Sequence, residues 1–269
     1  MRAICFLLFF FMGISSLKGE EIFDGKWQEI KGKHFVVLFV SAKDAEEAAK
    51  ILRKSEEYYN KVAQQIGFSR YGDFWTWDDR AKIYIFASQE EFIEATSQPA
   101  WSRGYVVSDT NLFDSRMIVT YRQEKDFSEG LLPHEISHLI LRDFIGSDRV
   151  IPIWFDEGVA QLQEADKKDV AYRIMKKVVT QKTHLSMAAL HRSNVRKEKD
   201  QQKVSLFYAE SLTVIDFLLK NYGSSAFGNM CRHFKEGKGI EEAIALSYGP
   251  TIKSFEDLEE KWRTYIENY

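Results

Sequence analysis

The stretch of this chain that decides its fold is HEISH at residues 134–138, which is followed by WFDEGVA at residues 154–160. Residues four apart on a helix lie on the same face, so the imidazoles of His134 and His138 can reach one metal ion. Zinc in a hydrolytic site takes three protein ligands and keeps a fourth position for water. Glu157, nineteen residues after the second histidine, is the candidate for the third ligand, carried by a second helix. The spacing therefore predicts one Zn2+ ion held by two histidines and a glutamate.

Glu135 directly follows the first histidine, where its carboxylate can reach the water on the metal rather than the metal. A carboxylate in that place can take a proton from the acidified water, so Glu135 is the predicted general base. The alternative is an ordinary amphipathic helix with two histidines four apart. The apolar flanks disfavour it, because buried histidines and carboxylates are costly without a partner or a cation. These flanking residues are Leu131, Leu132, Ile136, Leu139 and Ile140.

The segments LLPHEISH (131–138) and IPIWFDEGVA (151–160) resemble the gluzincin zinc metallopeptidases, and within them the bacterial peptidase MA-like group. The 18-residue gap before Glu157 is similar to that of the zinc aminopeptidases, whose third ligand lies in a Trp-x-x-Glu-Gly-x-Ala context. The likeness covers most of residues 34–269, strongly at the zinc motif and weakly elsewhere. It implies a thermolysin-like zincin fold, metallopeptidase activity and a peptide or protein substrate. The Gly-x-Met-Glu-Asn motif of the aminopeptidases is absent from the chain, so exopeptidase activity is not implied.

Strand-like segments gather in the first half of the chain and helix-like segments in the second half, which predicts an α+β fold. The long amphipathic segment 42–66 is expected to be a helix that stops at Gly67, and everything after residue 150 reads as helical. We expect the 117–121 strand, just before the metal helix, to form the sheet edge along which an extended substrate pairs. The predicted strands are residues 34–40, 82–86, 104–107 and 117–121.

The amino terminus has the pattern of a signal peptide: Arg2, an apolar stretch at residues 4–14 and a small-residue zone at 15–19. The apolar stretch is too short for a membrane helix, which needs about 20 residues. We therefore expect cleavage, export to the periplasm or the extracellular space, and no stable membrane span afterwards. The alternative is a protein anchored in the membrane through an uncleaved amino-terminal segment.

With residues 1–19 as the signal peptide, residues 20–269 are predicted to form a single zincin-type domain. Its sheet lobe is expected at about residues 30–145 and its helical lobe at about residues 150–269. The formal charge is only −3 and no basic run occurs, which argues against a nucleic-acid partner. Cys231 is the one cysteine outside the signal segment, so we interpret it as a buried apolar side chain rather than half of a disulfide.

Tyr208 is the candidate for the group that stabilises the oxyanion of the tetrahedral intermediate, because a phenol is a neutral hydrogen-bond donor. The resemblance supports this role, since related enzymes use a tyrosine or histidine from the helical lobe. The alternative is a core tyrosine, because Tyr208 shares one helical face with Leu212, Ile215 and Leu219.

Five further side chains are weaker candidates. His184, His191 and His233 could take the oxyanion role, but each is expected to lie on the surface. Asp156 and Glu164 are predicted to act as acceptors that orient an imidazole.

Three functions are consistent with these features. The first is a zinc-dependent peptidase acting outside the cytoplasm. The second is a catalytically inactive zincin-fold binding protein, which has no need of the base that Glu135 supplies. The third is a zinc hydrolase of a non-peptide amide bond, which fold and motif alone do not distinguish from a peptidase.

Overall fold

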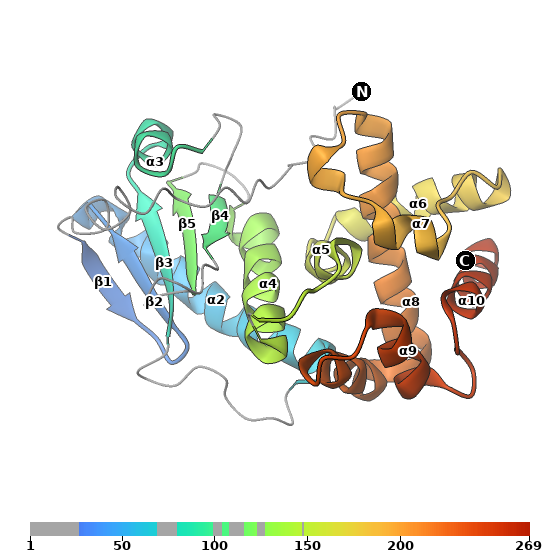
Figure 1. Cartoon of the computed structure of the whole chain (residues 1–269). Coiled ribbons are helices and arrows are strands. Elements are labelled where there is room, and N and C mark those ends of the chain that lie inside the picture. The colour runs from blue at the N-terminus through green and yellow to red at the C-terminus, as the bar shows by residue number, and fades with distance from the viewer. Residues whose placement is uncertain (1–26, 69–79, 99–103, 108–115, 123–126, 147) are drawn as a thin grey trace. The chain divides into compact units, whose positions relative to one another are not determined.

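The computed structural model contains helices and one β-sheet in a mixed arrangement, consistent with the predicted α+β class (Figure 1). The predicted signal peptide lies outside the residues that the structure describes. The described residues are 27–68, 80–98, 104–107, 116–122, 127–146 and 148–269.

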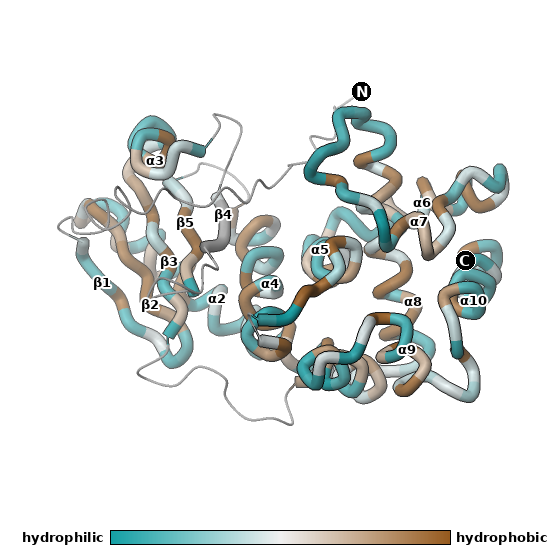
Figure 2. The backbone as a smooth tube through the Cα atoms, in the orientation of Figure 1, coloured by the Kyte–Doolittle hydropathy of each residue, from teal (hydrophilic) through white to brown (hydrophobic). Residues whose placement is uncertain are grey.

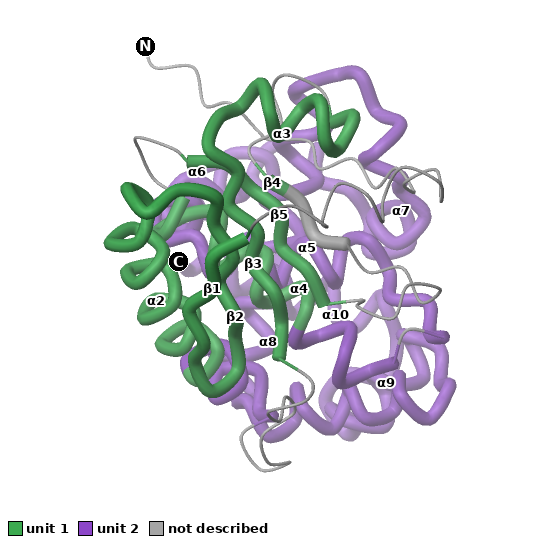
Figure 3. The backbone as a smooth tube through the Cα atoms, turned by 90° about the vertical axis from the view of Figure 1, so that its left-hand side faces the viewer, with its two compact units in different colours: residues 1–60, 73–139 green, residues 61–72, 140–269 purple. Residues whose placement is uncertain are grey.

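The chain divides into two compact units, which are coloured separately in Figure 3. Unit 1 comprises residues 1–60 and 73–139, and unit 2 comprises residues 61–72 and 140–269. Each unit has its own buried core, and each is described in turn.

Unit 1 is built on a five-stranded mixed sheet with the order β1-β2-β3-β5-β4. Strands β2, β3 and β5 run parallel to one another, whereas β1 and β4 pair antiparallel with β2 and β5. All four predicted strands are present. The strands are β1 (Gln28–Lys31), β2 (Phe35–Phe39), β3 (Ala81–Phe86), β4 (Gly104–Val107) and β5 (Met117–Tyr121).

The position of β5 corrects one prediction. This strand pairs with β3 on one side and with β4 on the other, so the expectation that residues 117–121 form the sheet edge is wrong. Four of the five residues of β5 are buried, as expected for a strand that is paired on both sides. Among the described strands, β4 is the outer one on this side of the sheet.

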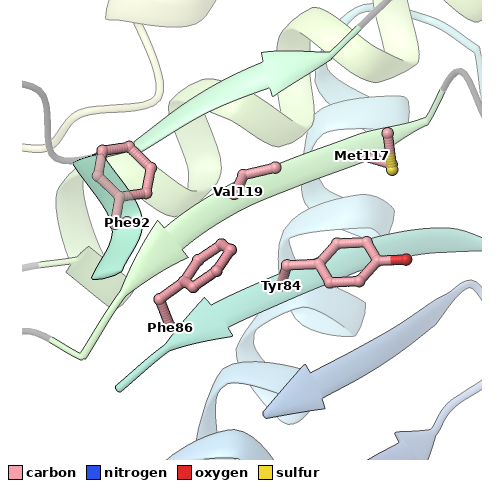
Figure 4. Close-up of a cluster of buried hydrophobic side chains, with 5 residues drawn as sticks. All are labelled: Tyr84, Phe86, Phe92, Met117 and Val119. Carbon is pink, nitrogen blue, oxygen red and sulfur yellow. The ribbon is translucent and has the colours of Figure 1, made fainter. Parts of the chain in front are cut away.

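Apolar side chains of β3 and β5 form a buried cluster on one face of the sheet (Figure 4). Residues that alternate along a strand share a face, and the brown colour of β5 in Figure 2 marks its apolar residues. The short helix α3 (Gln89–Thr96) adds Phe92 to this cluster. Its amino terminus is capped by Ser88, whose Oγ accepts a hydrogen bond from the Glu91 N–H at 3.2 Å. The cluster contains Tyr84, Phe86, Phe92, Met117 and Val119.

The predicted helix at residues 42–66 is α2 (Ala45–Gln65), preceded by a 3-10 turn at Ala42–Asp44. The helix ends where Gly67 adopts φ +83°, a backbone conformation that residues with a Cβ atom rarely adopt. Both the element and its stop signal were therefore predictable from the sequence.

Unit 2 is helical, and α8 is its central helix, with α5, α6 and α9 packed against it. Gly223, at φ 81° and ψ 164°, puts a kink in α8. The buried carboxylate of Asp216 joins α8 to α6, since it accepts hydrogen bonds from Tyr172 Oη at 2.6 Å and Lys168 Nζ at 2.8 Å. The helices are α5 (Ile153–Gln161), α6 (Lys167–Thr180), α7 (Met187–Arg192), α8 (Gln201–Lys235), α9 (Ile240–Tyr248) and α10 (Phe255–Glu267).

Cys231 is buried in α8 and has no disulfide, as interpreted from the sequence, and burial raises the pKa of its thiol well above the usual value. Within the described residues, no helix combines the length and the apolar composition that crossing a membrane requires.

Candidate metal centre

Helix α4 (Leu132–Ile145) carries both histidines of the HEISH stretch. Pro133 is the second residue of this helix. A π-helical turn, Phe127–Leu131, leads directly into the helix. This turn is tied to α2, because Tyr58 Oη donates to Glu129 Oε2 at 3.1 Å.

His134 and His138 lie one turn apart on α4 and are 1% and 4% exposed. Their Nε2 atoms are 3.2 Å apart, and their rings are inclined at 78°. Two nitrogen ligands of one tetrahedral zinc, each at about 2.0–2.1 Å from the ion, lie roughly 3.3 Å apart. The two imidazoles are thus spaced as ligands of a single metal ion are.

Glu157, on α5, completes the group. Single ligand atoms of His134, His138 and Glu157 all lie within 4.8 Å of one another, and all three residues are buried. No other group of three or more metal-binding side chains is found in the described part of the chain. Two imidazole nitrogens and one carboxylate oxygen are a donor set of hydrolytic zinc sites, so these residues fit the predicted ion.

Glu135 lies between the two histidines in α4 and is only 2% exposed. Successive residues of a helix point about 100° apart, so the carboxylate leaves the helix in a different direction from the two imidazoles. It is not among the three residues grouped as ligands. This placement is compatible with the predicted role of Glu135 as a base.

Gly158, next to the third ligand, allows α5 and α8 to approach closely. A Cβ atom at this position would lie 2.6 Å from the Ser211 carbonyl oxygen and 2.7 Å from Ile215 Cγ1. Real Cβ contacts do not occur at such distances, so glycine is required for this packing. The backbone of α5 beside Glu157 is therefore held against α8.

Tyr208, on α8, is 3% exposed. Burial raises the pKa of its phenol well above 10, the negative charge of Glu157 raises it further, and Arg196 opposes the shift. The phenol is therefore protonated at neutral pH and acts as a hydrogen-bond donor. Its burial agrees with the core alternative, and the influence of Glu157 agrees with the oxyanion alternative.

Asp156 precedes the third ligand and accepts hydrogen bonds from Arg142 on α4. Arg142 Nη2 lies 2.5 Å and Nε 3.2 Å from Asp156 Oδ2. Asp156 was predicted from the sequence to orient an imidazole, whereas Arg142 was not among the predicted site residues. The sequence did contain one indication of Arg142, which follows His138 by four residues and therefore lies on the same side of the helix.

The remaining candidates lie outside the metal group. The prediction that His184 lies on the surface is wrong, because its side chain is only 9% exposed and lies 3.4 Å from Glu259. His191 is exposed, whereas the side chain of His233 is 26% exposed and pairs with Glu236 at 3.1 Å.

Glu164 forms an ion pair with Lys167 in unit 2, at 3.8 Å between Oε2 and Nζ. Its negative charge also raises the pKa of Tyr208, as the last of the four contributions to that shift.

Comparison with known proteins adds an independent observation. The sequence profile of the family described as the Peptidase MA superfamily matches residues 76–268. This range contains the HEISH stretch, Glu157 and Tyr208. A search of curated protein sequences gives no match. The chain belongs to the peptidase MA superfamily.

Proposed function

We propose that this protein is a zinc-dependent metallopeptidase of the gluzincin type that hydrolyses peptide bonds outside the cytoplasm. The observation that carries the proposal is the buried group of His134, His138 and Glu157 in a chain of the peptidase MA superfamily. Family membership supports a metallopeptidase, and the nitrogen and oxygen donors favour zinc. Glu135 follows the first ligand in the sequence and is buried in the structure. Its carboxylate, which a binding protein does not need, favours an active enzyme.

His134, His138 and Glu157 would hold the ion. When bound, zinc supplies a Lewis acid that lowers the pKa of a water molecule and polarises the scissile carbonyl. Glu135 takes a proton from the attacking water and gives it to the leaving amine. Tyr208 donates a hydrogen bond to the carbonyl oxygen as negative charge develops there.

Strand β4 is the proposed docking edge for an extended substrate, in place of the 117–121 strand. It is the outer described strand on its side of the sheet. A Cβ atom on Gly104 would lie 3.1 Å from Leu131 Cδ2, so the strand passes close to the residue three before His134. A peptide that pairs with β4 through its backbone would therefore run beside the start of the metal helix.

Metal analysis and peptide cleavage test the proposal together. The protein, a His134→Ala variant and a His233→Ala control are loaded with zinc, dialysed and assayed on a peptide library with and without a chelator. We expect one zinc ion per chain in the wild type and in the control, because His233 lies outside the metal group. His134→Ala should lose the ion and the cleavage. A wild type that binds no zinc, or a His134→Ala variant that binds it equally well, contradicts the assignment.

Export is the remaining part of the proposal, and it is supported by the signal-peptide pattern of residues 1–19. We expect cleavage between about residues 15 and 19, which amino-terminal sequencing of the exported protein measures. A protein that still starts at Met1 and stays in the membrane fraction supports the anchor instead.

A further inference from the structure

Arg142 and Asp156 stand next to the proposed ligands in the sequence of their helices. Arg142 follows His138 by four residues, so it continues the same side of α4 one turn further. Asp156 precedes Glu157 on α5. A bond between these two side chains therefore connects the helix of the histidines to the helix of the third ligand.

The contact between them is short and largely protected from water. Both Arg142 Nη2 and Nε donate to Asp156 Oδ2, at 2.5 Å and 3.2 Å. The Arg142 side chain is 19% exposed and the Asp156 side chain is 6% exposed. Charge-assisted hydrogen bonds with two donors have a defined direction, so they fix the distance and the rotation of the two helices at this point.

We propose that Arg142 and Asp156 are positioning residues, whose ion pair sets the separation of His138 and Glu157 and thereby the affinity for the metal. This inference rests on the proposed metal site. It assigns to Arg142 a role in metal binding although the guanidinium is a cation and cannot be a ligand.

Electrostatics alone predicts a different outcome, which makes the proposal testable. Arg142 is a positive charge close to a cation site, so Coulomb repulsion predicts that Arg142→Met binds zinc more tightly. Positioning predicts that the same variant binds zinc more weakly. Asp156→Asn does not separate the two views, because both predict weaker binding.

The experiment measures zinc affinity by competition with a chromophoric chelator, together with the melting temperature of each metal-free variant. We expect Arg142→Met and Asp156→Asn to bind zinc about 10- to 100-fold more weakly, the range seen when groups that orient metal ligands are removed. The matched control is Lys168→Met, which removes a cation from Asp216, another buried aspartate of unit 2. It should lose some thermal stability and keep the wild-type zinc affinity.

Arg142→Lys serves if Arg142→Met does not fold. Lysine keeps the charge and loses the two-nitrogen contact, so electrostatics predicts no change, whereas positioning predicts weaker binding. The visible absorption of cobalt loaded in place of zinc should also change in the variants, because it reports the arrangement of the ligands. Zinc affinity in both arginine variants equal to or tighter than that of the wild type overturns the inference. Absence of zinc binding in the wild type overturns the proposed metal site instead.

Discussion

Gly158 and Ser211 lie so close together that a Cβ atom on the glycine would be 2.6 Å from the serine carbonyl oxygen. The contact joins the backbone of α5, one residue after Glu157, to the backbone of α8, three residues after Tyr208. The proposed third ligand and the proposed oxyanion donor are therefore connected by main chain rather than by flexible side chains.

This contact predicts that Gly158→Ala lowers the free energy of unfolding by about 1–3 kcal/mol, because the added methyl group forces the two helices apart. The shift of Glu157 should also weaken zinc binding. Denaturant unfolding and zinc titration measure the two effects. Gly130→Ala is the control, since no atom lies within 4 Å of a Cβ at that position. Equal stability of Gly158→Ala and the wild type would show that the helices adjust freely.

Glu135→Gln should separate metal binding from hydrolysis. Glutamine has the size and hydrogen-bonding capacity of glutamate but cannot accept the proton from water. We expect zinc content equal to that of the wild type and a loss of peptide cleavage, measured by metal analysis and a peptide assay on the same sample. Cleavage at the wild-type rate would refute the role of Glu135 as the base.

Tyr208→Phe should lower kcat by roughly 10²–10³ with little change in KM, the effect of removing one oxyanion donor. The control is Tyr248→Phe, since Tyr248 is also a buried tyrosine of unit 2 and its hydroxyl has no hydrogen-bond partner among the described residues. That variant should keep the wild-type kcat. If Tyr208→Phe loses thermal stability while its turnover is normal, Tyr208 belongs to the core and the donor is another group.

Stability should fall as the pH rises, because of Glu210. Burial raises the pKa of this carboxyl from 4.5 to about 8; the hydrogen bond from the Leu185 N–H opposes the shift, and the charge of Glu259 adds to it. Between pH 4.5 and about pH 8 this carboxyl is protonated in the folded state and ionised in the unfolded state. Its contribution to the free energy of unfolding is therefore fully present below pH 4.5 and is lost as the pH rises to about 8.

Glu210→Gln should remove this pH dependence and make the protein more stable than the wild type at pH 8.5. Denaturant unfolding at several pH values measures it, with the exposed Glu260→Gln variant as the control that keeps the wild-type curve. A Glu210→Gln variant whose stability falls with pH as steeply as that of the wild type would contradict the assignment to Glu210.

The features that could be predicted from the sequence are those that depend on residues close together in the chain. The i, i+4 spacing placed His134 and His138 together, and Gly67 marked the end of the helix predicted at residues 42–66. Strand β1 was missed because three of its four residues, Gln-Glu-Ile-Lys, are polar and exposed, so it contains no apolar run. A strand of this kind is recognised only by its pairing with β2.

Features that depend on long-range packing could not be predicted. The order of β4 and β5 follows from pairing across the sheet, which the apolar character of residues 117–121 does not encode. The pairing of Arg142 with Asp156 requires two helices to be in place. His184 was expected on the surface, and its contact with Glu259 could not be predicted because that residue lies 75 residues further along the chain.

The burial of His134, His138 and Glu157 has a consequence for the lifetime of the protein. Each is at most 5% exposed, so without a cation these polar groups give up hydration on folding. An ion that binds only the folded chain adds about 2.7 kcal/mol to its stability at a free concentration 100 times Kd. On the proposed metal binding, a shortage of the ion would raise the unfolded fraction of the chain, which is the fraction that proteases degrade.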